Sequence, residues 1–183
     1  EYLRQRFGDK FKVLTKYAEF DKSNKPAGFR PHAPLRMLYT GNLGSGRYSS
    51  LCLIAKALRQ VNAHEQRIVF DIYTSTVLSE KLRSRLNTAE TTLHDAVSFE
   101  KVLELQRRAD ILVHVEGLSL KERLDVAHSF STKIVDYLQQ CKPIFVVGKD
   151  DCASIRYFID NDSGIVAQNY DEIVRKLTAI AAS

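Results

Sequence analysis

From residue 35 onward, apolar segments of strand length alternate with amphipathic segments of helix length. The strand-like segments are apolar and β-branched, as expected for strands that are buried on both faces. The alternation predicts strands at residues 35–40, 67–73, 92–96, 111–115, 143–147 and 164–167. It predicts helices at residues 48–60, 79–86, 99–108, 131–140, 153–161 and 170–181.

Such alternation is typical of a parallel sheet whose crossover helices cover both faces. We therefore predict an α/β fold, a Rossmann-like doubly wound parallel sheet of about six strands. In these sheets ligands bind beyond the carboxyl ends of the strands, where the strand order reverses. The loops that follow the strands are thus the places to search for a site.

The first predicted strand runs into a loop that contains Gly41, Gly44 and Gly46 and is followed by Arg47. Glycine lets the backbone approach an oxygen without a Cβ in the way, and the start of the next helix is expected to offer unpaired N–H groups. Arg47 adds a fixed positive charge. The loop is a candidate phosphate site, although a helix that begins after Gly and Ser with nothing bound has the same pattern.

Several common sites do not fit these residues. A dinucleotide site needs G-x-G-x-x-G and an acid near the end of the second strand, which here ends at Tyr73-Thr74. A P-loop needs Gly-Lys-Ser or Gly-Lys-Thr, where this chain has Gly46-Arg47-Tyr48. There is no G-x-S-x-G or H-E-x-x-H motif, and the five histidines are dispersed. We therefore expect neither a dehydrogenase nor a bound metal.

The overall charge favours a small anionic ligand. The net charge is +5 and the pI is about 9.1, but the basic residues are scattered, which argues against nucleic acid as a partner. Cys52, Cys141 and Cys152 form no C-x-x-C pair, which is typical of a reducing compartment. No apolar run approaches the ~20 residues of a membrane span, and no signal peptide is evident. We expect a cytoplasmic protein.

Residues 1–34 are predicted to be an arm, with a polar helix at 1–10, a short strand at 11–14 and a Pro-rich connector at 21–34. The arm favours a chain that is the later part of a larger protein. An N-terminal extension of a complete protein is the alternative.

A second informative segment covers residues 131–144. Ser131 or Thr132 is a suitable N-cap, and Thr132 and Asp136 lie on one helix face with the carboxylate roughly 6 Å beyond the helix start. A nucleoside diphosphate fits this spacing, with phosphate at the helix start and ribose hydroxyls at Asp136. An Asp on a solvated face and a plain capping Thr are the alternative.

Residues 39–47, 108–114 and 131–144 together resemble the nucleotide-sugar-binding half of GT-B glycosyltransferases. The likeness is closest to the retaining, bacterial polysaccharide-type group, and the three segments occur in the family's order. It implies that residues 35–183 are the C-terminal, donor-binding domain. An acceptor-binding domain would then precede residue 1 in the same protein.

The resemblance also implies roles for individual residues. Arg47 would hold the donor diphosphate, Asp136 the ribose, and Tyr73 and Val97 would lie near the base. The substrate-binding residues expected in this way are Gly41, Asn42, Gly44, Gly46, Arg47, Tyr73, Val97, Ser131, Thr132, Lys133 and Asp136.

The chain departs from the family pattern at two positions. The family has two acids eight residues apart, of which the first contacts the donor sugar, but counting back from Asp136 gives His128. Glu116 is an alternative that the spacing does not support well. Asn42 stands where the family often has a basic residue. No catalytic residue is therefore assigned.

The resulting expectation is the donor-binding half of a glycosyltransferase that moves a sugar from a nucleoside-diphosphate sugar to an acceptor in polysaccharide or glycoconjugate synthesis. We expect no cofactor, because Arg47, helix N-termini and Lys133 can stabilise the departing diphosphate. A nucleotide-sugar epimerase and a non-catalytic nucleotide-sugar-binding module are the alternatives. Peripheral membrane association of the full-length enzyme stays open.

Overall fold

The computed structural model describes residues 5–6 and 32–182. Its strands are β1 (Leu35–Thr40), β2 (Ile68–Thr74), β3 (Thr91–Asp95), β4 (Ile111–Val115), β5 (Ile144–Val147) and β6 (Ile165–Ala167). Its helices are α2 (Arg47–Val61), α3 (Glu80–Leu86), α4 (Phe99–Arg108), α5 (Leu120–Val126), α6 (Lys133–Gln139), α7 (Ala153–Asp160) and α8 (Tyr170–Ala181). The predicted arm lies almost entirely outside the described residues, so the predicted boundary at residue 35 stays a prediction.

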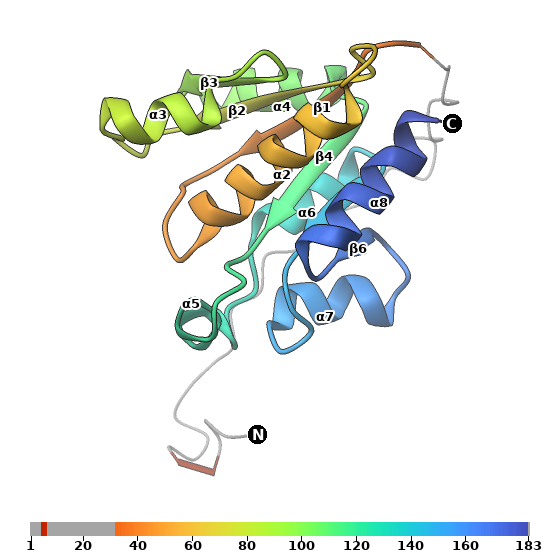
Figure 1. The fold of residues 1–183 in the computed structure, drawn as a ribbon. Helices are drawn as coiled ribbons and strands as arrows, with labels where there is room; N and C mark the ends of the chain where they lie inside the picture. The colour runs from red at the N-terminus through yellow and green to blue at the C-terminus, as the bar shows by residue number, and fades with distance from the viewer. Residues whose placement is uncertain (1–4, 7–31, 183) are drawn as a thin grey trace.

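The strands form a six-stranded sheet in the order β3-β2-β1-β4-β5-β6, with every pair parallel. The sheet lies between two layers of helices (Figure 1). This arrangement confirms the predicted α/β, Rossmann-like doubly wound fold. The order reverses between β1 and β4, which are neighbours in the sheet although two strands separate them in the chain.

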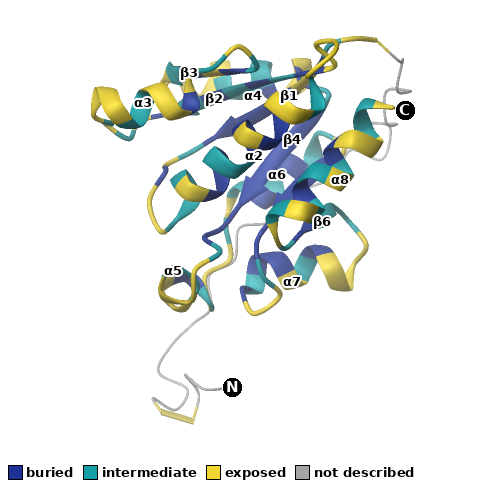
Figure 2. Cartoon of the chain, viewed as in Figure 1, coloured by how far each residue is buried: buried dark blue, intermediate teal, exposed yellow. Residues whose placement is uncertain are grey.

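Alternation along the strands divides the core into two halves, because successive side chains of a strand point to opposite faces. Met37 and Tyr39 of β1 pack with α2 and α8 on one face, whereas Leu38 packs with α6 and α7 on the other. Strands β4 and β5 are buried throughout, and exposed residues lie mainly on the outer sides of the helices and in the loops (Figure 2). The core therefore holds the ends of β1 and β4 rigidly.

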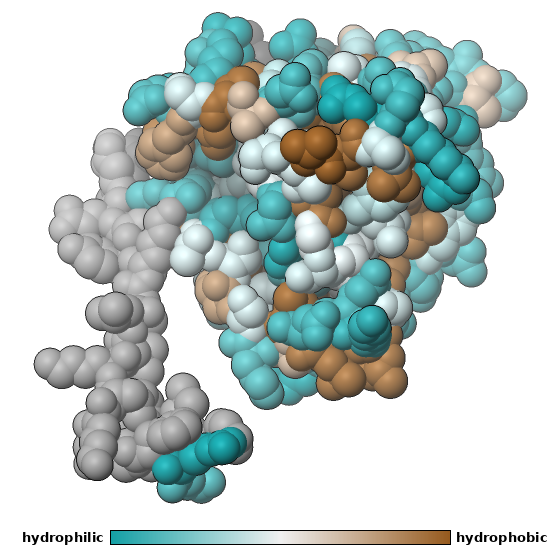
Figure 3. Space-filling view, turned by 90° about the vertical axis from the view of Figure 1, so that its left-hand side faces the viewer, coloured by the Kyte–Doolittle hydropathy of each residue, from teal (hydrophilic) through white to brown (hydrophobic). Residues whose placement is uncertain are grey.

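The surface has no single large apolar region in the view that brings the α3 and β3 side forward. Apolar side chains form separate patches among hydrophilic ones there (Figure 3). None of the helices in the described part of the chain is long and apolar enough to cross a membrane.

Most predicted elements match the observed ones to within one or two residues at each end, and one helix was missed. The strict alternation is broken after β4, where α5 and α6 follow one another before β5. Helix α5 was not predicted, because it is only two turns long and begins at a Ser119–Glu122 capping box rather than at an apolar repeat. The helix predicted at residues 131–140 is shorter, Lys133–Gln139.

Candidate functional site

The candidate site lies where the sheet order reverses. From β1 the chain passes into α2 on one face, and after β4 it reaches α6 on the opposite face. The two connections diverge and leave a crevice beyond the carboxyl ends of β1 and β4. The glycine loop lies on one side of this crevice, and the start of α6 lies on the other.

The glycine loop is a tight turn in which two glycines are required. Gly41 has φ +150° and Gly46 has φ +78°, and a Cβ on Gly41 would lie 2.7 Å from Lys133 Nζ. The N–H of Arg47 donates to Gly44 O at 3.1 Å, and that of Tyr48 donates to Leu43 O at 3.1 Å. The expectation that the first turn of α2 offers unpaired N–H groups is thus wrong for these two residues, because carbonyl groups of the same loop accept both N–H groups.

Arg47 is held between two acceptors at the start of α2. Its Nη1 donates to Asn42 Oδ1 at 2.9 Å, and its Nη2 lies 2.9 Å from Glu116 Oε2. The side chain of Arg47 is 15% exposed and that of Glu116 is 2% exposed. The guanidinium therefore lies directly beneath the glycine loop with a fixed orientation.

Lys133 reaches the same loop from α6. Its Nζ donates to Thr40 O at 3.3 Å and lies 4.3 Å from the centre of the Tyr39 ring. Burial, reinforced by the positive charge of Arg47, lowers the pKa of Lys133 to about 7, although Glu116 acts in the opposite direction. Residues from two different connections thus place two basic side chains at the end of β1.

The remaining predicted residues of α6 lie near its start. Thr132 is the N-cap residue, as expected, but its backbone is helical and its side chain makes no capping hydrogen bond. Ser131 accepts the N–H of Ile134 through its backbone carbonyl at 3.1 Å. Asp136 is half-buried in the first turn of the helix. Its role toward a ribose stays a prediction.

A cavity of about 230 Å³ adjoins the glycine loop and contains both residues expected near the base. Tyr73 stacks on His94 at 4.3 Å between ring centres, and His94 Nε2 lies 2.6 Å from Asp71 Oδ1. One face of the Tyr73 ring is therefore covered and supported by His94. The cavity is lined by Thr40, Gly41, Asn42, Tyr73, Thr74, Ser75, Ala96, Val97 and Val102.

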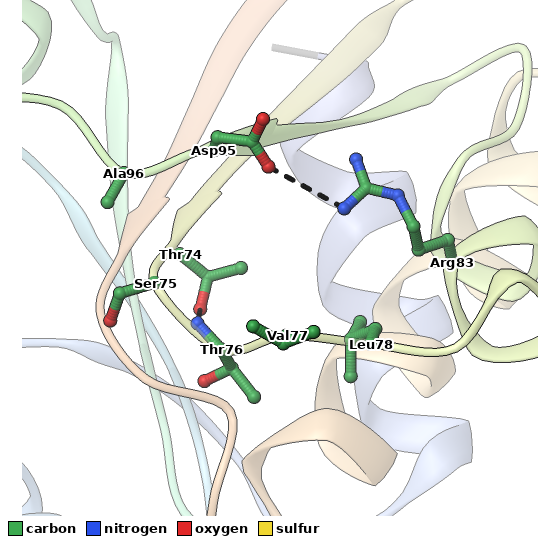
Figure 4. Close-up of a pocket in the computed structure, with 8 residues that line it drawn as sticks. All are labelled: Thr74, Ser75, Thr76, Val77, Leu78, Arg83, Asp95 and Ala96. Atoms are coloured by element: carbon green, nitrogen blue, oxygen red, sulfur yellow. Dashed lines mark hydrogen bonds and ion pairs between the residues drawn. The ribbon is translucent and has the colours of Figure 1, made fainter.

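A second cavity, of about 370 Å³, continues from the first and shares Thr74, Ser75 and Ala96 with it. In Figure 4, Asp95 from the end of β3 and Arg83 from α3 point toward one another across it. Their ion pair spans 3.6 Å. The two cavities therefore adjoin, and the second is the larger.

Two site residues had no firm prediction from the sequence. Glu116 follows β4 directly and was considered only for contact with a sugar, whereas here it pairs with Arg47. His114 looked like one residue of an apolar strand, but it is fully buried and its Nε2 lies 3.7 Å from Glu116 Oε1. Their place at the end of the strand that borders the reversal was the signal that could have identified them.

Within the described part of the chain, no three His, Cys, Asp or Glu side chains gather in a group that could hold a metal ion. Cys52, Cys141 and Cys152 form no disulfide with one another. The absence of a resident metal or cofactor stays a prediction.

No protein-family model matches the chain, and no curated protein matches it either. Solved structures do match. The GtfA/B complex aligns with a TM-score of 0.59 and 16% sequence identity over 84% of this chain. WaaG, a glycosyltransferase involved in lipopolysaccharide biosynthesis, aligns with a TM-score of 0.56 and 15% identity over 83% of this chain. An α,α-trehalose-phosphate synthase (UDP-forming) from Burkholderia vietnamiensis aligns with 0.55 and 8% over 82%.

The chain has a glycosyltransferase-like fold. At these identities the likeness concerns the fold alone, and it supports the predicted GT-B resemblance at that level. The chain spans 30% of the GtfA/B chain, 39% of WaaG and 38% of the synthase. The retaining type and the C-terminal position stay predictions.

Proposed function

We propose that this chain is the donor-binding half of a glycosyltransferase, which binds a nucleoside-diphosphate sugar and presents it to an acceptor held by another domain. The observation that carries the proposal is the convergence of Arg47 and Lys133 on the glycine loop at the reversal of the sheet. Two basic groups match the two negative charges of a bound diphosphate. Polysaccharide or glycoconjugate synthesis and a cytoplasmic location are part of the same proposal.

The side chains, rather than the helix start, would provide most of the attraction for phosphate. The N–H groups of Arg47 and Tyr48 are already bonded within the loop. Fixed cations beside a leaving diphosphate stabilise the charge that develops as the glycosidic bond breaks. Arg47 suits this role because its guanidinium stays charged at any physiological pH.

The cavity beside the loop supports a position for the base. It is lined mainly by small apolar and hydroxyl side chains, and the supported Tyr73 ring forms one wall. A planar ring can pack against such a wall while the phosphates extend toward Gly41 and Lys133. In the proposed function the carboxylate of Asp136 accepts hydrogen bonds from the ribose hydroxyls.

Nucleoside diphosphates should stabilise the chain against heat, and nicotinamide dinucleotides should not. A ligand that binds only the folded state adds about 2.7 kcal/mol at a hundred times its dissociation constant, which raises the Tm measurably. Thermal unfolding with uridine, guanosine, adenosine and thymidine diphosphates checks this. An unchanged Tm with all four at millimolar concentration would contradict the donor site.

Asp136→Asn should weaken the binding of ribonucleoside diphosphates by about 1.5 to 3 kcal/mol, the range for a hydrogen bond to a charged group. The same variant should leave a 2′,3′-dideoxynucleoside diphosphate unaffected, because the hydroxyls that Asp136 would accept are already missing. Calorimetric titration of both ligands into both proteins measures the difference. Equal losses for the two ligands would indicate a structural role for Asp136 and contradict the ribose assignment.

A further inference from the structure

Beside the glycine loop, four ionisable side chains from three elements act on one another electrostatically, and two of them, His114 and Glu116, are fully buried. They are Arg47 at the start of α2, His114 and Glu116 at the end of β4, and Lys133 at the start of α6. Glu116 is anchored through its backbone, since its N–H donates to Val147 O at 2.8 Å and its carbonyl accepts Ser50 Oγ at 2.7 Å. The carboxylate therefore has a fixed position between the basic groups.

Glu116 acts electrostatically on both basic groups of this cluster, Arg47 and Lys133. Burial lowers the pKa of His114 well below its ordinary value, and the charges of Lys133 and Arg47 lower it further, so His114 is neutral. Other titratable groups near the cluster include Tyr39 of β1, Tyr137 of α6 and Cys152 at the start of α7, and burial raises the pKa of all three. The carboxylate of Glu122 from α5 lies beside Gly46, the residue before Arg47.

We propose that Glu116 is a positioning residue of the donor site, which orients Arg47 through their ion pair and places a negative charge beside the basic groups that would receive a diphosphate. The inference rests on the proposed function, because it deepens the role of the same site. Without Glu116, two cations would face one another in a buried space. Such a pair is unfavourable, and Lys133 is the member that can lose its proton.

The pKa of Lys133 makes this role measurable. Near pH 7 the lysine is partly neutral in the free chain, and a bound diphosphate would favour its protonated form. Donor affinity should thus rise as the pH falls from about 9 to about 7 and level off below the pKa of the free lysine. We call the pH below which donor affinity no longer rises the levelling point. Glu116 raises the pKa of the free lysine, so Glu116→Gln should move the levelling point to lower pH.

The test is calorimetric titration of uridine diphosphate glucose between about pH 6 and about pH 9.5, a range in which its phosphodiester groups do not titrate. The levelling point should move down by about one pH unit or more in Glu116→Gln, the usual effect of removing a nearby opposite charge. Glu116→Asp keeps the charge and should move it less. Lys133→Met should abolish the pH dependence.

Asn42→Ala is the matched control, because it removes the other contact of the Arg47 guanidinium without removing a charge. It should weaken binding at every pH and leave the levelling point where it is in the unmodified chain. The same levelling point in Glu116→Gln and in the unmodified chain would overturn the proposal.

An NMR titration of the Lys133 Cε resonance without any ligand separates this inference from the proposed function. A lower lysine pKa in Glu116→Gln supports the role of Glu116, and an unchanged value overturns it. If neither uridine diphosphate glucose nor the nucleoside diphosphates bind the unmodified chain, the proposed function is contradicted instead. The lysine titration still decides the role of Glu116 in that case.

Discussion

The 183-residue chain alone should bind a nucleotide sugar and transfer no sugar from it. In the proposed function the acceptor is held by another domain, and the chain spans only 30–39% of the solved chains that share its fold. Holding two reactants together lowers a barrier by about 7 to 11 kcal/mol, and this contribution is missing when one reactant is unbound. Incubation with a radiolabelled donor and a panel of sugar and lipid-linked acceptors measures transfer directly.

Binding of the same donor by the same preparation is the necessary control, because an unfolded sample would also be inactive. Donor binding without product is the expected result. Turnover by the chain alone, abolished by Arg47→Ala, would show that the acceptor site lies within these residues and would contradict the proposal of a separate domain.

The strand pattern predicted most of the fold because it is local. Every residue of β4 is buried. An apolar run of that length between two amphipathic helices is compatible with few structures other than a buried parallel strand. The glycine loop was also evident, since Gly41 and Gly46 occupy conformations that favour glycine. The cavity brings Tyr73 and Val97 next to Gly41, as the order of parallel strands requires.

The pairing of Arg47 with Glu116 could not be predicted, because 69 positions of sequence separate them and only the crossing at the reversal of the sheet brings them together. The prediction of unpaired N–H groups at the start of α2 was wrong for a related reason. Their acceptors are carbonyls within the same loop, and their direction depends on the left-handed backbone of Ser45 and Gly46. Composition and periodicity contain no information on either.

Arg47→Met should destabilise the fold by about 3 to 5 kcal/mol, the usual cost of leaving a buried charge without its partner. Methionine keeps the apolar stem of the side chain, so the loss reflects the charge rather than a cavity. Urea unfolding at pH 7 measures the free energy of unfolding. Arg67→Ala is the control, since Arg67 pairs with Glu65 at 2.8 Å but both side chains are about half exposed, and such a pair contributes less than about 1 kcal/mol.

The double variant Arg47→Met/Glu116→Gln should recover most of this loss, because the unpaired carboxylate is then also gone. The pH dependence gives an independent check. Burial raises the pKa of Glu116 and Arg47 lowers it, so removing Arg47 raises it further. A carboxyl whose pKa is higher in the folded state binds more protons there, and stability falls as the pH rises through that range. The deficit of Arg47→Met should therefore shrink toward acid pH, and a deficit no larger than that of Arg67→Ala at pH 7 would mean that the pair does not stabilise the site.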